Sequence, residues 1–193
     1  MRLSFRPLAE EDLAQLARWL AEPHVREWWH DPSDLDAVRD KYLPCIRAEE
    51  PTEVFVIVLE GGDLGIMERY RLSTHPDWAH TIAATGHSYA NAAGIDYFIG
   101  VRDAIGRGTG TQAVEDFTRL LFADYPDIEQ VVVTPQLGNR ASCRALEKSG
   151  YELMWTGRLE SDDPSDAGTA ALYVQRRSSV TQGGSAGGSA RPE

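Results

Sequence analysis

The chain has 193 residues, of which 42% are hydrophobic and 25% charged, so we expect one folded domain with a single core. A formal charge of −11 disfavours nucleic acid and anionic membranes as partners and is compatible with a cationic small molecule. The two cysteines cannot support a disulfide scaffold or a zinc site, and no apolar run reaches the roughly 18 residues of a membrane span, so we expect a cytoplasmic protein.

The first half of the chain predicts a strand, a helix and a hairpin. A short strand over 2–5 precedes a helix that starts near Glu10, repeats apolar residues at helical spacing and ends at Pro23. Two apolar runs over 55–59 and 64–72 flank the turn residues Gly61, Gly62 and Asp63, which favours an antiparallel hairpin. Residues 73–93 show no convincing periodicity, and we expect an unstructured loop on the side of the acceptor substrate.

The second half predicts a crossover between parallel strands. A strand over 95–101, a glycine-rich turn, a helix over 108–125 and a strand over 128–133 follow one another. Asn139 suits the N-cap of a further helix that ends at Lys148, with Gly150 at its C-cap. Strands over 151–157 and 170–175 complete a domain spanning 1–177, and the Gly/Ser-rich residues 178–193 predict a flexible tail.

The glycine-rich turn is the motif that carries chemistry. Gly106, Gly108 and Gly110 precede or open a helix, where backbone N–H groups can approach a phosphate with no Cβ in the way. By itself the motif is weak evidence, because glycine clusters also form ordinary tight turns. It lacks the lysine of a P-loop, and no acidic residue ends the next strand as a dinucleotide-binding fold would require.

In combination, several segments resemble the GNAT superfamily of acetyl-coenzyme A-dependent N-acyltransferases. The resemblance spans about 1–177 and rests on the glycine loop 106–111, on Asn139 and on the end of the following helix, 146–151. Within this superfamily, segments 24–29 and 94–96 are most similar to the aminoglycoside 6′-N-acetyltransferases, and segment 42–44 also resembles these enzymes. The family's fold is α/β (α+β), with a mixed, mostly antiparallel sheet splayed between its two central strands and helices on both faces.

The resemblance also implies acetyl-coenzyme A as co-substrate and assigns residues to it. The backbones of Ile99 and Val101 would pair with the pantetheine arm, and Asn139 would contact the coenzyme from the opposite side. Ile105 stands where the superfamily usually has Gln or Arg, for which we expect at most a weaker affinity, because backbone amides form the cradle. The residues implied for the pyrophosphate cradle are Gly106, Arg107, Gly108, Thr109, Gly110 and Thr111.

Asp96 is the candidate general base for deprotonating the attacking amine. It lies in an otherwise apolar segment, where a carboxylate is costly unless it is paired or used, and where its pKa would rise. The alternative is a structural ion pair with an arginine such as Arg69. The resemblance favours catalysis, because Asp96 occupies the last position of the Gly-Ile-Asp motif of the 6′-N-acetyltransferases.

Two positions depart from the pattern of these enzymes. Leu146 stands where they place a tyrosine as general acid, and Thr134 stands where they place a substrate-binding aspartate. These departures leave the fold intact but put the identity of the acceptor in doubt. The thiolate would then leave unassisted or through water.

Acceptor-side candidates are aromatic or acidic. Trp29 and Tyr42 match substrate-side positions of the resembled enzymes, whereas Trp28 fits a core cap equally well. On a regular strand Tyr97 would face away from Asp96. The predicted substrate-binding residues are Trp29, Tyr42, Glu68, Asp96, Tyr97 and Asp166. The acidic run at 162, 163 and 166 also suits a surface loop, and the five histidines show no metal-ligand spacing, so no metal site is expected.

Three functions remain open. The first is acetyl transfer to a cationic amine, above all the 6′-amine of an aminoglycoside, with Asp96 as base, no acyl-enzyme, and a monomer or weak homodimer as the active form. The second is a siderophore-type N6-hydroxylysine acyltransferase, which Glu68 and Leu146 fit but which usually has histidine in place of Asp96. The third is a coenzyme A-binding module without catalysis, suggested by the missing tyrosine.

Overall fold

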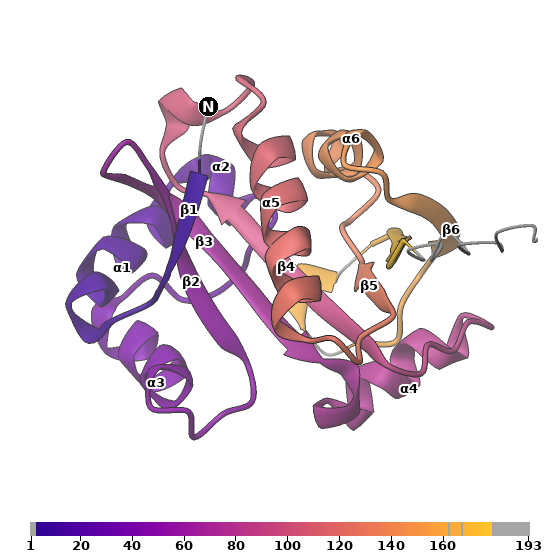
Figure 1. The fold of residues 1–193 in the computed structure, drawn as a ribbon. Helices are drawn as coiled ribbons and strands as arrows, with labels where there is room; N and C mark the ends of the chain where they lie inside the picture. The colour runs from indigo at the N-terminus through magenta and orange to yellow at the C-terminus, as the bar shows by residue number, and fades with distance from the viewer. Residues whose placement is uncertain (1–2, 162, 167, 179–193) are drawn as a thin grey trace, which may run out of the picture.

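The computed structural model describes residues 3–161, 163–166 and 168–178, which form a seven-stranded mixed sheet with helices on both faces (Figure 1). The strand order is β1-β2-β3-β4-β5-β7-β6. The strands are β1 (Leu3–Pro7), β2 (Glu53–Leu59), β3 (Gly62–Arg71), β4 (Ala92–Ile99), β5 (Gln130–Val133), β6 (Glu152–Gly157) and β7 (Ala170–Arg176). The helices are α1 (Leu13–Ala21), α2 (Pro23–Arg26), α3 (Leu35–Ile46), α4 (Pro76–Ala84), α5 (Thr109–Asp124) and α6 (Arg140–Lys148).

The predicted hairpin and crossover are both present. β2 and β3 pair antiparallel across a turn in which Glu60 and Gly61 have φ of 51° and 82°. β4 and β5 are parallel neighbours joined through α5, as the order of strand, glycine turn, helix and strand predicts. Every other neighbouring pair in the sheet is antiparallel.

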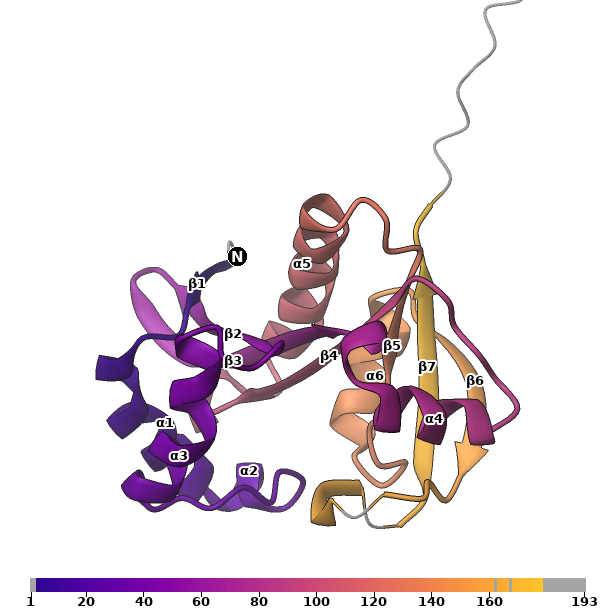
Figure 2. The same ribbon diagram turned by 90° about the horizontal axis from the view of Figure 1, so that it is seen from below.

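The sheet is split between β4 and β5. Their pairing covers only Ala92–Gly94 of β4 against Gln130–Val132 of β5, after which β4 continues for five residues without β5 beside it. Figure 2 shows the two halves of the sheet diverging from this point. The edge of β4 that faces the split therefore has backbone groups available to a ligand, which is the splay that the resemblance implied.

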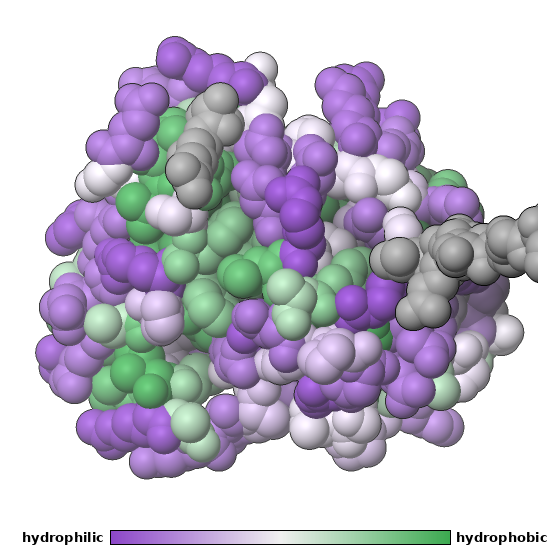
Figure 3. Space-filling view, viewed as in Figure 1, coloured by the Kyte–Doolittle hydropathy of each residue, from purple (hydrophilic) through white to green (hydrophobic). Residues whose placement is uncertain are grey.

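Three apolar clusters hold the helices to the sheet. The largest joins α5 and α6 to one face, where Phe117 and Leu121 of α5 are fully buried. On the other face, α1, α2 and α3 pack over β2 and β3, and α4 packs over β5 and β7. In the view of Figure 3 the margin is mostly hydrophilic, while apolar side chains gather nearer the centre, over the strands beside α5.

Residues 73–93 do not form an unstructured loop, so that expectation is wrong. They contain helix α4 and the start of β4. α4 begins with Pro76, which is favourable at the first helical position, and it buries a single large apolar side chain, Ile82. One buried position is too little for a sequence periodicity, which explains why the helix escaped detection. Helix α3 was not predicted either.

The described helices include none that is long and apolar enough to cross a membrane. Cys143 is buried and Cys45 half-buried, and both thiols are free. The tail expected over 178–193 lies, from residue 179 on, outside the described part of the chain.

Candidate active site

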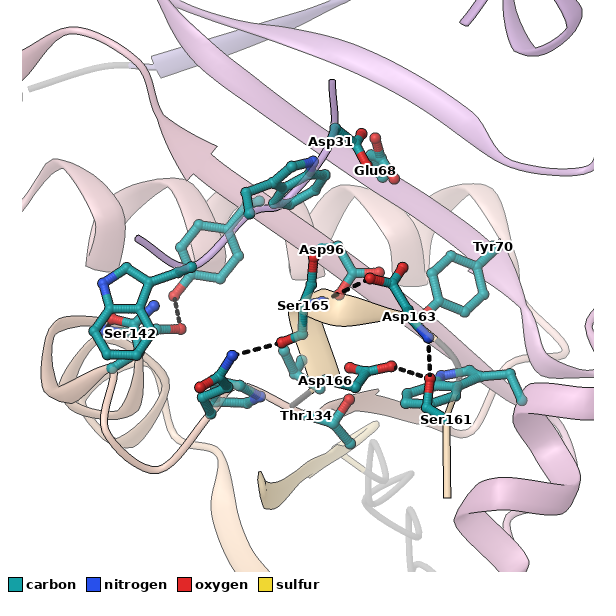
Figure 4. A pocket seen from close by; sticks show the side chains of 18 of the residues that line it. Asp31, Glu68, Tyr70, Asp96, Thr134, Ser142, Ser161, Asp163, Ser165 and Asp166 are labelled. Carbon is teal, nitrogen blue, oxygen red and sulfur yellow. Dashed lines mark hydrogen bonds between the residues drawn. The ribbon is translucent and has the colours of Figure 1, made fainter. Parts of the chain in front are cut away.

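Two cavities meet where β4 and β5 separate. One, of about 360 Å³, is lined by acidic and aromatic side chains (Figure 4). The other, of about 500 Å³, is lined by β4, the glycine loop and α6. The residues that line both cavities, and so mark their junction, are Trp28, Trp29, Tyr97, Asn139 and Ser142.

The glycine loop in the larger cavity is shaped to receive an anion. Gly106 and Gly108 have φ of 75° and 84°, a left-handed conformation that other residues rarely adopt, and α5 begins directly after them. A Cβ added at Gly106, Gly108 or Gly110 would meet no protein atom within 4 Å. Open space before the N-terminus of a 16-residue helix fits a phosphate group, because the first N–H groups of α5 point outward there.

Six of the nine residues predicted for the coenzyme line this cavity. They are Ile99, Gly106, Gly108, Gly110, Thr111 and Asn139. Arg107 is exposed and Thr109 is buried at the start of α5, and neither lines it. Val101 is also absent from the lining. Its N–H donates to the Leu64 carbonyl at 3.0 Å and its carbonyl accepts from Ala104 at 3.0 Å, so its backbone is already satisfied.

Two hydrogen-bond contacts fix residues that line the larger cavity. His24 Nε2 lies 3.0 Å from the Ile99 carbonyl, on the part of β4 that pairs with β3 but not with β5. Asn139 caps α6 by accepting a hydrogen bond from the Ser142 N–H at 3.1 Å, which confirms its predicted N-cap role. Its side-chain amide nitrogen is then the group that remains for a ligand.

The smaller cavity is strongly acidic. Lys41 and Asp31 neutralise each other across 2.6 Å, and the remaining carboxylates outnumber the cations in the described lining. Asp96, Asp163 and Asp166 lie together in Figure 4, with Asp96 coming from β4 and the other two from the segment before β7. The lining carboxylates are Asp31, Glu68, Asp96, Asp163 and Asp166. Residue 162, the other member of the acidic run, lies outside the described residues.

Asp96 and Glu68 form a carboxyl pair across two strands. They are directly opposite in the register of β4 and β3, so their side chains share one face of the sheet. Burial, opposed by the Tyr70 hydroxyl, raises the pKa of Asp96 to about 6. Burial and then the charge of Asp96 raise the pKa of Glu68 to about 8, and its Oε1 has no hydrogen-bond partner in the described structure. At neutral pH, Asp96 is therefore ionised and Glu68 is protonated.

The alternative in which Asp96 pairs with Arg69 is wrong. Arg69 lies on the opposite face of β3, where it bridges Glu53 and Asp124 at 2.6 Å each and stacks on Tyr125. Side chains alternate along a strand, so the residue beside Glu68 cannot reach the cavity that Glu68 lines. Asp96 keeps its carboxylate for the cavity.

Gly94 explains the first position of the Gly-Ile-Asp segment. It is opposite Tyr70 in the register, and the Tyr70 ring lies over it so closely that an added Cβ would be 2.6 Å from the hydroxyl oxygen. The glycine thus lets Tyr70 lie flat on β4, with its hydroxyl next to Asp96 two residues further on. Tyr70 was not predicted, because its strand position alone does not show which residue lies opposite.

Of the aromatic residues discussed for the acceptor side, some line the cavities and one acts through a neighbour. Trp29 lines both cavities and packs edge-to-face on Phe98, with ring centroids 5.0 Å apart. Tyr42 is fully buried and does not line the cavity, but its hydroxyl donates to Asp31 Oδ2 at 2.8 Å. Trp28 also lines both cavities, although a core position was equally compatible with the sequence.

The two departures from the resembled pattern have different surroundings. Leu146 is fully buried in the core beneath α6 and lines neither cavity. Thr134 lies in the acidic cavity just after β5. Asp163 and Asp166 line the same cavity, so carboxylates reach it from a different segment.

Several lining residues were not predicted from the sequence. Asp31, Trp78 and Ser142 come from segments distant in the chain, and each looks like an ordinary surface or helix residue by itself. Only Trp78 could have been found from the sequence, because it lies within residues 73–93, which were predicted to be on the side of the acceptor substrate. No group of three or more histidine, cysteine, aspartate or glutamate side chains suited to a metal ion occurs in the described part of the chain.

The amino-acid sequence matches a known protein family. The model of the acetyltransferase (GNAT) domain matches residues 9–158. Aminoglycoside N(6′)-acetyltransferase type 1 of Klebsiella pneumoniae is 30% identical over 179 residues, which cover 91% of this chain and 83% of that protein.

Solved structures agree with this match. The aminoglycoside acetyltransferase AAC(6′)-Ib in complex with coenzyme A and kanamycin has a TM-score of 0.78 and 29% identity, covering 91% of this chain and 95% of that one. The structure of AAC(6′)-Ib with paromomycin and acetyl-coenzyme A has a TM-score of 0.78, also at 29% identity, covering 92% and 94%.

Replacing Gly94 with alanine tests the packing of Tyr70. The added methyl group displaces the ring, and we expect a loss of about 2 kcal/mol, which lowers the melting temperature by roughly 4–8 °C. Gly110→Ala is the control, because its Cβ meets no atom within 4 Å and its melting temperature is expected to be unchanged or higher. Thermal unfolding followed by circular dichroism checks both, and an unchanged melting temperature of Gly94→Ala would contradict the packing.

Glu68→Gln tests the raised pKa of Glu68. Because the folded protein holds this proton up to about pH 8 while the unfolded chain releases it near 4.5, stability falls as pH rises through this window. Glutamine cannot ionise, so the variant is expected to gain on the order of 4 kcal/mol over the wild type at pH 8.5 and little at pH 4. Melting temperatures at both pH values measure this, with the exposed Glu49→Gln as control. Equal gains at both pH values would refute the raised pKa.

Proposed function

The chain belongs to the GNAT acetyltransferase family, and from this premise we propose that it transfers the acetyl group of acetyl-coenzyme A to the 6′-amine of an aminoglycoside. The catalytic unit of this proposal is the domain over residues 1–177. The relatives named aminoglycoside N(6′)-acetyltransferase, and the AAC(6′)-Ib structures with kanamycin and with paromomycin, support the choice of acceptor.

The meeting of two chemically different cavities is the observation that carries the proposal. The larger cavity offers backbone amides at the start of α5 and the cations Arg144 and Lys148, beside apolar residues such as Ile99 and Phe98, which suits an anionic coenzyme with an apolar arm. The smaller one offers carboxylates, which suit a polycationic amine. A reaction between the two ligands would take place at their junction, beside Asp96 and Tyr97.

The coenzyme would be held by backbone more than by side chains. The N–H groups around Gly108 and Gly110 would bind the pyrophosphate, the unpaired edge of β4 near Ile99 would pair with the pantetheine arm, and Asn139 would contact it from α6. The bound coenzyme supplies an activated acyl group. We also expect Arg107 and Thr109 to contribute only their backbone amides, because neither side chain lines the cavity.

Asp96 would act as the general base. Its carboxylate is ionised at neutral pH, and its raised pKa makes it a stronger base than an ordinary aspartate. It would accept a proton from the substrate ammonium and so free the nitrogen lone pair for attack on the acyl carbon. Direct transfer needs no acyl-enzyme, and neither cysteine lines either cavity in the described structure.

The other acidic residues would bind and orient the aminoglycoside. Asp163 and Asp166 face the cavity from one side and could bind ammonium groups, whereas Asp31, on the other side, is already paired with Lys41 and could add only a hydrogen-bond acceptor. Trp29 and Trp78 offer ring faces to the sugars and their ammonium groups. Tyr42 would act through Asp31, whose carboxylate it holds in place.

The test is acetyl transfer measured by release of free thiol. We expect turnover with kanamycin and tobramycin and little with spermidine, whose amines lack the sugar rings. If coenzyme A binds but no aminoglycoside is acetylated, the proposed acceptor is wrong. Preferential transfer of longer acyl groups to N6-hydroxylysine would favour the siderophore-type alternative instead.

Asp96→Asn tests the base. We expect kcat to fall at least about 100-fold while coenzyme A binding is retained, because the amide cannot accept the proton. In the wild type, kcat/KM for the amine is expected to fall about tenfold per pH unit below about pH 6, as Asp96 becomes protonated. Asp163→Asn is the matched control. For this variant we expect a higher KM for the amine, while kcat/KM still falls below about pH 6 as in the wild type. Full activity of Asp96→Asn would exclude the base role.

A further inference from the structure

Two hydroxyl groups meet at the junction of the cavities. The Tyr97 hydroxyl, from β4, lies 3.0 Å from Ser142 Oγ, from the first turns of α6, and either oxygen can be the donor. This contact spans the split in the sheet, since β4 is on one side of it and α6 follows β5 on the other. Asp96 precedes Tyr97 and faces the opposite side of the strand, so the two functional groups approach the junction from different faces.

Acetyl transfer develops negative charge at this junction. As the amine nitrogen bonds to the acyl carbon, the bond from that carbon to sulfur breaks and its electron pair stays on the sulfur. The acyl carbon must be reachable from both cavities, so the sulfur lies near the residues that line both. Among these residues, Tyr97 and Ser142 supply hydroxyl groups, and Asn139 supplies its side-chain amide nitrogen because its oxygen caps α6. Leu146, which lines neither cavity, offers no donor.

We propose that Tyr97, held by Ser142, donates the hydrogen bond that stabilises the departing thiolate of the coenzyme. This inference rests on the proposed acetyl transfer. The contact allows either direction; in this role Ser142 donates to the phenolic oxygen, which leaves the Tyr97 O–H to donate to the sulfur. The ring is anchored against the core beneath α5 and α6, so the hydroxyl is positioned before the coenzyme arrives.

Tyr97 keeps its proton in this role. Burial raises its pKa to about 12, whereas a cysteine thiol, the nearest side-chain analogue of the coenzyme thiol, has a pKa of about 8.5, so the thiolate is too weak a base to remove the phenolic proton. The ammonium loses two protons in becoming an amide, one through Asp96 and one to water. The thiolate takes one proton from water after it has left, and charge balances.

The pKa of the thiol in bound coenzyme A tests this directly. A hydrogen bond from Tyr97 to the sulfur favours the thiolate, so Tyr97→Phe is expected to raise the pKa of the bound thiol by about 1 unit. The ¹³C chemical shift of the labelled methylene carbon next to sulfur, titrated in the complex, reports it. Ser142→Ala is expected to raise the pKa by less. Tyr89→Phe, which removes a hydroxyl that lies outside both cavities, is the control and should leave it unchanged.

Steady-state kinetics provide the second readout. We expect Tyr97→Phe to lower kcat by about 10- to 100-fold with an unchanged KM for acetyl-coenzyme A, and Ser142→Thr to retain the activity that Ser142→Ala loses in part. A bound thiol with the same pKa in Tyr97→Phe and wild type would overturn this inference alone. If the wild-type protein fails to bind coenzyme A, the proposed acetyl transfer fails and this inference fails with it.

Discussion

β4 and β5 pair over three residues and then separate, and the two cavities depend on that separation. A continuous sheet would satisfy the backbone groups of β4 from Ile95 to Ile99 internally, and no edge would remain for a coenzyme arm. One apolar cluster spans both halves on the face of α5 and α6, whereas each half has its own cluster on the other face. α5 and α6 pack on one face, while α1 to α3 and α4 pack on separate halves of the other. The packing of the helices therefore maintains the split. Beyond Gly94, β4 still pairs with β3 along its other edge.

The charge of the molecule is divided in the same way. An acidic chain can bind an anionic coenzyme because the N-terminal amides of α5, together with Arg144 and Lys148 of α6, line the larger cavity. The carboxylates gather in the smaller cavity, where burial and then the charge of Asp96 raise the pKa of Glu68. A bound cationic substrate would offset the electrostatic free energy of these buried carboxylates. The same residues that destabilise the fold above pH 5 therefore favour binding of an amine.

The departures at Leu146 and Thr134 have structural replacements nearby. Leu146 belongs to the core, and the hydroxyl pair of Tyr97 and Ser142 lies at the junction instead. Carboxylates near Thr134 come from Asp163 and Asp166. Function of this kind follows the position of a group in the cavity, so a substitution at one family position does not by itself remove the chemistry.

Local patterns in the sequence determined much of this protein. The hairpin, the crossover, the N-cap at Asn139 and the glycine loop depend on neighbouring residues, and each is present as predicted. α4 and α3 were missed because neither buries a long apolar stripe. Only the tertiary structure decided that Tyr70 lies on Gly94, that Glu68 faces Asp96, and that Arg69 does not. Strand register and the angle between two halves of a sheet arise from contacts between distant segments, which no local pattern encodes.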